Sequence, residues 1–210
     1  MSMIQFQVEM QDLREIEQAL GMAKDKSKFV LRAAINNTAK EVEKRMTKEA
    51  SKRYALYEGG VGAYRAITKI DKAKTNNLVA TVTAKDSKQF DLYKYKLNDR
   101  TYYPGSKGAP SWIKAKQLKR GSLKKLSLMR GGSGDAYKAF VVQYQNGHLA
   151  LAERVPGSHM KSNPAKEALK SLYATSKPKA EEFVYKEFIE DDMNTVLMRN
   201  IEAQIHRFLG

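Results

Sequence analysis

The chain has 210 residues, 42% of them apolar, and its 38 Lys and Arg residues against 23 Asp and Glu residues give a net charge of +15. This composition excludes a disordered chain and favours polyanionic partners, while the lack of cysteine excludes disulfides, thiolate metal sites and a cysteine nucleophile. No apolar run reaches the ~20 residues of a membrane-spanning helix, and residues 1–25 lack the apolar centre of a signal peptide, so we expect no membrane partner.

The N-terminal part of the chain predicts a short strand followed by two helices. Apolar and polar residues alternate over residues 3–9, which is typical of a strand. Residues 12–22 place their apolar side chains on one face of a helix. A longer helix is expected over residues 28–57, because its apolar residues recur at steps of three and four. That stripe consists of Leu31, Ile35, Ala39, Val42, Met46, Ala50 and Tyr54.

The middle of the chain predicts an antiparallel sheet. Short apolar segments bounded by turn residues indicate strands. These strands are expected over residues 77–85, 90–97, 111–118, 136–145 and 148–155. The last two are separated by Asn146 and Gly147, which both tolerate positive φ and therefore predict a tight hairpin.

Residues 165–210 are expected to return to helix, with a break at Pro178. The resulting order predicts an α+β fold, in which a long N-terminal helix and a C-terminal helix pack on a largely antiparallel β-sheet. We expect one domain over residues 1–210. Within it, residues 1–60 would form the N-terminal strand and helices, residues 77–155 the β-rich core with basic loops, and residues 165–210 the C-terminal helical segment.

No group of side chains predicts catalysis. The three histidines fall in different elements without metal-ligand spacing, and adjacent carboxylates such as Glu190, Asp191 and Asp192 point in different directions on a helix. We therefore expect no metal site, no cofactor and no enzymatic activity. One enzymatic alternative stays open, a nuclease that uses Asp86 and Lys88 with Mg²⁺, although a matching acidic residue upstream is missing.

Positive charge is concentrated in residues 97–132, where nine basic residues stand against one acidic residue, Asp99. In an extended strand Lys114 and Lys116 share one face and Ala115 lies on the other, which predicts a cationic ridge over a packed layer. Such a ridge contacts phosphates without reading bases. The alternative is a solvated loop whose lysines serve solubility. The residues expected to face DNA are Lys114, Lys116, Lys119, Arg120, Lys124, Lys125 and Arg130.

Negative charge is concentrated in residues 179–195, which contain six acidic and two basic residues. A chain with a basic middle and an acidic C-terminal helix can pair head to tail with copies of itself, and such pairing closes a ring if the rotation allows. The two regions could equally meet within one subunit.

Three polar residues, Asn36, Asn37 and Thr38, lie in the middle of the long predicted helix although Asn and Thr are mediocre helix formers. A buried amide destabilises a protein unless it is paired, so such residues tend to fix one packing arrangement. We therefore expect these side chains to lie at a contact, either with the sheet or with a neighbouring subunit.

Residues 31–54, LRAAINNTAKEVEKRMTKEASKRY, resemble the N-terminal helix of the phage minor tail protein Z family, the tail-completion proteins of long-tailed phages and prophages. The matching residues are Leu31, Ala34, Ile35, Asn36, Thr38 and Ala39. Asn37 stands where the family often has Arg. Residues 139–155 are similar to the family's strand pair that ends in an Arg, here Arg154.

A third segment, residues 169–183, is similar to a further stretch of the same family. The matching residues there are Leu172, Tyr173, Ser176 and Pro178. The segment departs from the family where Ala174 and Thr175 replace a Gly-Pro pair.

The resemblance implies a non-enzymatic virion protein, a tail-completion or neck subunit at the head-proximal end of a phage tail that helps head–tail joining and DNA positioning in the channel. It implies a homo-oligomeric ring, expected to be six-fold, with the tail terminator and the head–tail connector as neighbours and double-stranded DNA in the lumen. Location in the virion is then expected, after assembly in the host cytoplasm. Asn36, Asn37 and Arg154 are expected at subunit or packing contacts.

Two non-enzymatic alternatives stay open. The first is a free nucleic-acid-binding protein that uses the same basic residues without sequence preference and without a ring. The second keeps the structural class but places the chain in another neck ring, as a tail terminator or a head-closure protein.

Overall fold

The computed structural model describes residues 2–7, 14, 18, 21, 26–86, 90–125, 127–129 and 136–209. Its residues group into two compact units, and the chain passes from one to the other four times. The helical unit consists of residues 1–51, 61–86 and 177–210, and the β unit consists of residues 52–60 and 87–176. The sequence predicts one domain over residues 1–210, whereas the structure clusters its residues into these two units.

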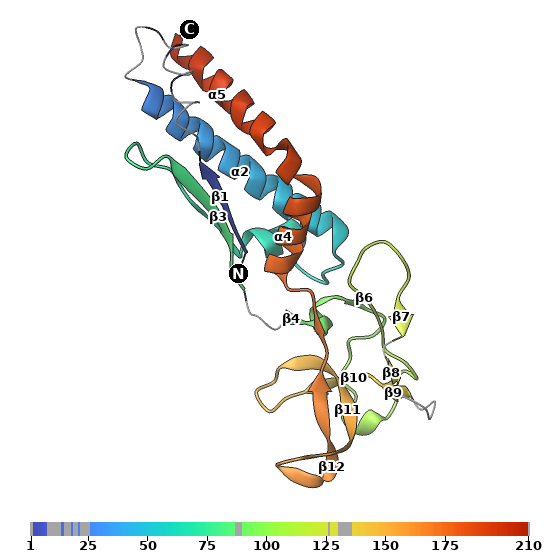
Figure 1. The fold of residues 1–210 in the computed structure, drawn as a ribbon. Coiled ribbons are helices and arrows are strands. Elements are labelled where there is room, and N and C mark those ends of the chain that lie inside the picture. The colour runs from blue at the N-terminus through green and yellow to red at the C-terminus, as the bar shows by residue number, and fades with distance from the viewer. Residues whose placement is uncertain are drawn as a thin grey trace. The chain divides into compact units, whose positions relative to one another are not determined.

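The helical unit contains a three-stranded antiparallel sheet and the main helices of the chain. Its elements are β1 (Ser2–Gln7), α2 (Ser27–Arg53, whose last two residues belong to the β unit), α3 (Gly60–Arg65), β2 (Thr68–Asp71), β3 (Val79–Ala84), α4 (Lys177–Phe188), η4 (Glu190–Asp192) and α5 (Met193–Leu209). The strand order is β1-β3-β2. Figure 1 shows the sheet along one side of α2 and α5 along the other.

Helix α2 carries the apolar stripe that the sequence predicts, and the stripe is buried because α2 is covered on two sides. Val30, Leu31 and Ala34 pack with Ile201 of α5 in one buried cluster. The helix ends at Arg53, four residues before the predicted end. Beyond it the backbone is extended, because the N–H of Ala55 donates to the carbonyl of Gln117 and continues a sheet of the β unit.

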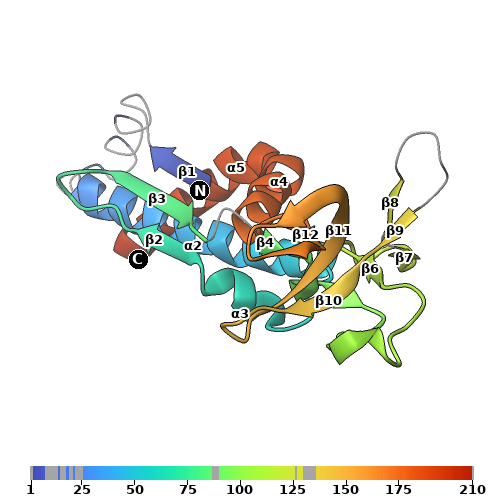
Figure 2. The same ribbon diagram turned by 90° about the horizontal axis from the view of Figure 1, so that it is seen from below.

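The β unit contains short antiparallel strands. They are β4 (Phe90–Asp91), β5 (Lys96–Leu97), β6 (Lys114–Lys116), β7 (Lys124–Lys125), β8 (Ser127–Met129), β9 (Ala136–Lys138), β10 (Phe140–Gln143), β11 (Leu149–Met160), β12 (Asn163–Ser171) and β13 (Tyr173–Ala174), with 3-10 turns η2 (Leu92–Lys94) and η3 (Pro104–Ser106). The sheets are β10-β11-β12, β13-β4, β5-β6-β7 and β8-β9. Figure 2 shows β10 beside β11. Gly147 has φ of 79° in the predicted hairpin between them.

The predicted α+β fold with a long N-terminal helix, a C-terminal helix and antiparallel sheets is confirmed. None of the helices in the described ranges is both long enough and apolar enough to span a membrane. Of the predicted helix over residues 12–22, only single residues are described, so that prediction lies outside the described residues.

The expected start of the C-terminal helical segment is wrong. Residues 163–171 form β12 and residues 173–174 form β13, and α4 begins at Lys177. The stretch from Ala165 to Leu169 is rich in good helix formers, but its backbone pairs with β11, with Leu169 opposite Arg154 and Ala168 opposite Val155. Strand pairing outweighs a helix propensity of a few tenths of a kcal/mol per residue.

The predicted strand over residues 90–97 is broken into β4 and β5. The carboxylate of Asp91 accepts a hydrogen bond from the backbone N–H of Tyr93 at 2.8 Å and caps the turn η2. An aspartate side chain that bonds two residues ahead favours a turn over a continuous strand.

Candidate nucleic-acid interface

The basic segment of the chain is built on the sheet β5-β6-β7. Lys96 of β5 pairs with Lys116 of β6, and Lys114 of β6 pairs with Lys125 of β7. Along β6 the predicted alternation is present, because Lys114 is exposed whereas Ala115 is 5% exposed. The sheet therefore rests on an apolar layer and presents lysines on its other side.

Lys96 and Lys116 lie directly opposite each other, so their side chains leave the same face of the sheet. Like charges in directly opposite positions destabilise an antiparallel pair. The arrangement is therefore unfavourable for the isolated fold and becomes favourable when an anion lies against the face.

A pocket of about 530 Å³ adjoins this pair, and Lys119 also lines it. Its other lining residues are Ala55, Leu56, Tyr57 and Leu97. None of the described residues that line this pocket is acidic. Lysine side chains suit phosphate oxygens, which their ammonium groups meet as point charges without base recognition. We refer to Lys96, Lys116 and Lys119 as the lysine pocket.

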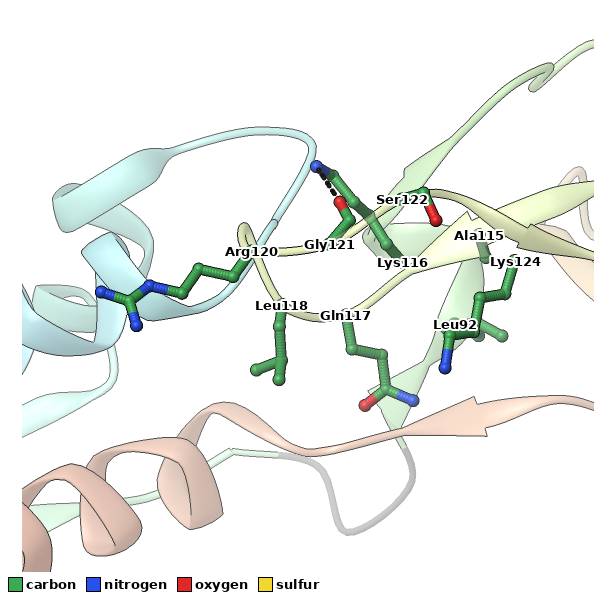
Figure 3. A pocket seen from close by; sticks show the side chains of 9 residues that line it. All are labelled: Leu92, Ala115, Lys116, Gln117, Leu118, Arg120, Gly121, Ser122 and Lys124. Carbon is green, nitrogen blue, oxygen red and sulfur yellow. Dashed lines mark hydrogen bonds between the residues drawn. The ribbon is translucent and has the colours of Figure 1, made fainter.

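Lys116 also holds the turn that connects β6 to β7. Its Nζ donates to the carbonyl oxygens of Lys119 at 3.0 Å and Gly121 at 3.3 Å, and the second bond is drawn in Figure 3. Gly121 has φ of 86°, a left-handed conformation that favours glycine. The ammonium group of Lys116 is therefore fixed in place while keeping donor capacity for a further acceptor.

The predicted DNA-facing residues lie on both faces of this sheet. Lys124 pairs with Ala115 and so lies on the face opposite Lys116. Lys116, Arg120 and Lys124 nevertheless all line a second pocket of about 400 Å³, together with Leu92 and Ala115. Figure 3 shows Arg120 pointing away from Lys124, on the other side of the turn.

The side chains of two members of the predicted set are not described. The backbone of Lys125 lies in β7, and Arg130 lies outside the described residues. Conversely, Lys96 belongs to the lysine pocket although the sequence did not single it out. The signal that would have found Lys96 is the register between the predicted strands 90–97 and 111–118, which places it beside Lys116.

Arg100 contributes to the structure of the β unit. Its guanidinium carbon lies 3.8 Å from the ring centroid of Tyr57 and 4.0 Å from that of Tyr93. The same group donates to the carbonyl oxygens of Tyr93 and Tyr95. A planar guanidinium between two rings is a strong cation–π arrangement, so the charge of Arg100 is largely committed to holding this segment.

The acidic residue of the basic segment, Asp99, is also occupied locally. It accepts hydrogen bonds from the backbone N–H of Thr101 at 2.8 Å and from the hydroxyl of Tyr103 at 2.9 Å. The backbone bond from Thr101 is the main reason that the pKa of Asp99 is lowered. Asp99 therefore stays ionised within its own turn.

The structure gives Asn36 and Thr38 partners inside the helical unit. The Asn36 side chain hydrogen-bonds the backbone of Ala73, and the Thr38 hydroxyl accepts from the Nδ2 of Asn200 at 3.0 Å. Asn37 is half-buried and makes no side-chain hydrogen bond to the described part of the chain. The polar run therefore links α2 to the β2–β3 connection on one side and to α5 on the other.

Arg154 belongs to the β unit, whereas the contacts of Asn36 and Thr38 belong to the helical unit. It is an exposed residue of β11 opposite Leu169 of β12, and its guanidinium carbon lies 5.5 Å from the ring centroid of Phe140. Its charge covers an aromatic ring and also faces solvent.

The residues of the nuclease alternative do not form a site in the described structure. Asp86 Oδ2 lies 3.0 Å from Nζ of Lys177, in an ion pair at the start of α4, and Lys88 lies outside the described residues. Among the described residues, no group of three or more His, Asp or Glu side chains is arranged so that it could hold a metal ion.

Comparison with known proteins gives no match: no family model, no curated protein and no solved structure matches this chain. The chemistry of the site therefore follows from its own residues. The lysine pocket combines one ammonium group held by backbone carbonyls, that of Lys116, with two exposed lysines, Lys96 and Lys119, and such a group of cations is suited to binding anions.

Proposed function

We propose that this protein is a non-enzymatic structural subunit of a phage virion, a tail-completion or neck subunit at the head-proximal end of the tail. There it helps join head to tail and positions the DNA in the channel. The observation that carries the proposal is the lysine pocket, in which Lys96 and Lys116 face each other across two strands with Lys119 beside them. The resemblance of residues 31–54 to the minor tail protein Z family supplies the location.

The chemistry of the pocket suits DNA that must move. Ammonium groups contact phosphates through charge, and phosphate contacts carry no sequence information. The binding free energy of such contacts falls steeply with salt and lets DNA slide. In the proposed role, copies of the chain form a ring, expected to be six-fold, between the tail terminator and the head–tail connector, with double-stranded DNA in the lumen.

The experiment that tests this role is electron microscopy of particles from a lysate in which the gene is inactivated, beside lysates complemented with variants. We expect full heads and tails of normal length that fail to join, or joined particles that do not deliver DNA. The wild-type gene should restore infectious particles, and the double variant Lys96→Glu/Lys119→Glu should restore joining without normal DNA delivery. Lys48→Glu, on the solvated face of α2, is the matched control and should behave as wild type.

Other results of these experiments would favour one of the alternative functions. Normal, infectious particles without the gene product contradict the proposal and favour a free nucleic-acid-binding protein. Tails of abnormal length contradict the completion role and favour a tail terminator. Cleavage of plasmid DNA by the purified chain with Mg²⁺, lost in Asp86→Asn, would restore the nuclease alternative.

A further inference from the structure

A groove lies between α2 and α5 in the helical unit, with a volume of about 310 Å³. It is lined by Phe29, Arg32, Ala33, Gln204, Arg207 and Phe208. The two phenylalanines are 42% and 45% exposed, which is unusual for side chains of this size. Large exposed apolar side chains rimmed by polar groups mark interaction sites.

The groove is cationic as well as aromatic. The guanidinium carbon of Arg32 lies 5.4 Å from the ring centroid of Phe29, and Nζ of Lys26 lies 5.9 Å from the same centroid. Neither Arg32 nor Arg207 forms an ion pair with any residue in the described ranges. The chemistry therefore selects an occupant that combines carboxylates with an aromatic or apolar side chain.

This chain itself carries such a segment at residues 187–192, Glu-Phe-Ile-Glu-Asp-Asp, which joins α4 to α5 through η4. Phe188 is 51% exposed, and the acidic residues on both sides of it are exposed. Arg45 of α2 fixes the segment, because its Nη2 lies 2.9 Å from Oδ2 of Asp192 and donates to the carbonyl of Phe188 at 3.4 Å. The segment is therefore a preformed acidic and aromatic surface, which we call the acidic corner.

The acidic corner cannot reach the groove of its own chain. Arg45 holds it beside the C-terminal half of α2, whereas Phe29 lies sixteen residues earlier, about 24 Å along the same helix. Figure 1 shows that α5 runs beside α2 and returns toward the N-terminal end of α2, so the two surfaces lie at opposite ends of one helix pair.

We propose that the acidic corner of one copy docks into the α2–α5 groove of the next copy. The inference rests on the proposed ring and names the surface that would form it. Phe188 would pack against the two phenylalanines while Glu187, Glu190 and Asp191 meet Arg32 and Arg207. Because the two surfaces differ, the contact is heterologous and repeats from copy to copy until the ring closes. The sequence also allows the basic middle of the chain as partner of the acidic segment, and the groove is the partner that we propose here.

The test is a charge exchange on the full chain, followed by analytical ultracentrifugation. A groove variant, Arg32→Glu/Arg207→Glu, and a corner variant, Glu190→Arg/Asp191→Arg, should each raise the dissociation constant of the oligomer at least ten-fold. An equimolar mixture of the two should restore the oligomer, because every contact then joins opposite charges again. A matched control, Lys40→Glu/Lys44→Glu on the solvated face of α2, should associate like wild type.

Restoration on mixing is a result that misfolding of either variant cannot produce. Wild-type chain that stays monomeric at high concentration contradicts the inference, as do variants that associate normally. Reduced thermal stability of the groove variant with an unchanged oligomer also contradicts it, since it would place a segment of the same chain in the groove. The virion phenotype is measured separately, so a ring formed through other surfaces would overturn this contact while leaving the proposed function standing.

Discussion

The carboxamide of Asn36 forms two hydrogen bonds with the backbone of Ala73, which lies 37 residues further along the chain. Nδ2 donates to the carbonyl oxygen at 3.1 Å, and Oδ1 accepts from the N–H at 2.8 Å. Ala73 is buried in the connection between β2 and β3, so its peptide groups need partners. The amide of Asn36, a poor helix former in mid-helix, thus satisfies the backbone of a residue that lies outside the strands β2 and β3.

Replacing Asn36 by Ala should lower the free energy of unfolding by about 1–3 kcal/mol, because it leaves buried backbone groups without a partner. Asn37→Ala is the matched control on the next residue and should change it by less than about 0.5 kcal/mol. Urea unfolding of both variants measures the difference. Equal effects at the two positions would mean that the hydrogen bonds to Ala73 do not account for Asn36.

Lys96→Gln should change stability and DNA binding in opposite directions. Removing one of two directly opposed lysines should raise the free energy of unfolding by about 0.2–1 kcal/mol. The same change should weaken DNA binding and reduce the slope of log K against log salt by about one phosphate contact, or ~0.9. Lys48→Gln on the solvated face of α2 should leave the binding slope unchanged.

These two measurements are urea unfolding and a salt titration of fluorescent duplex DNA binding. A Lys96→Gln chain that binds DNA with the wild-type slope would contradict DNA binding at the lysine pocket. A chain that becomes less stable would show that Lys96 has a structural partner rather than an opposing charge.

Arg100→Lys should destabilise the β unit although the charge is kept. The lysine side chain cannot stack as a plane between Tyr57 and Tyr93 or donate to two carbonyls in the same geometry. We expect a loss of about 1–2 kcal/mol in the free energy of unfolding and a wild-type salt slope for DNA binding. Unchanged stability of the Arg100→Lys chain would mean that the contacts of the guanidinium with Tyr57 and Tyr93 do not hold this segment.

Glu181 makes stability depend on pH in the direction opposite to that of a salt-bridged carboxylate. Its side chain is fully buried, and burial raises its pKa from 4.5 to about 8. The hydroxyl of Thr68 lies 2.9 Å from the Tyr64 carbonyl oxygen and 3.0 Å from Oε1 of Glu181. A bond donated by Thr68 to the carboxyl of Glu181 lowers the pKa, but burial has the larger effect and raises it.

Between pH 4.5 and about 8 the folded chain therefore binds a proton that the unfolded chain has released. The contribution of Glu181 is complete below the lower pH and is lost as the pH rises through the window, by up to ~1.4 kcal/mol per pH unit. Glu181→Gln, which is neutral and of the same shape, should flatten that dependence. Unfolding free energies of both chains at pH 5, 7 and 9 measure this difference. If the wild-type chain gained stability relative to Glu181→Gln as the pH rises, the raised pKa of Glu181 would be contradicted.

The sequence predicted the parts of the fold that follow from local periodicity and turn chemistry. The stripe of α2 and the hairpin at Gly147 depend on residues close together in the chain, and both are present. Residues 165–176 failed as a helix because pairing with β11 decided their conformation, and that pairing is not encoded within the segment. Local pattern rules cannot weigh such a contact against helix propensity.

The basic surface of the β unit was likewise predicted only in part, because local alternation can be read from the sequence and strand register cannot. Lys114 and Lys116 follow from alternation within one strand, whereas Lys96 enters through the register between strands twenty residues apart. Lys124 pairs with Ala115 and so leaves the other face of the sheet from Lys116, yet both residues line the second pocket. The run of charge predicts an anionic partner, which stays a prediction, and strand pairing decides which lysines share a face of the sheet.

The most direct test of the central claim is immuno-electron microscopy of purified particles from the host of this gene, with an antibody raised against the whole chain. The account predicts label at the junction of head and tail, on the tail side, in every complete particle. Label spread over the head or along the tail, or particles that join and carry no label, would contradict it.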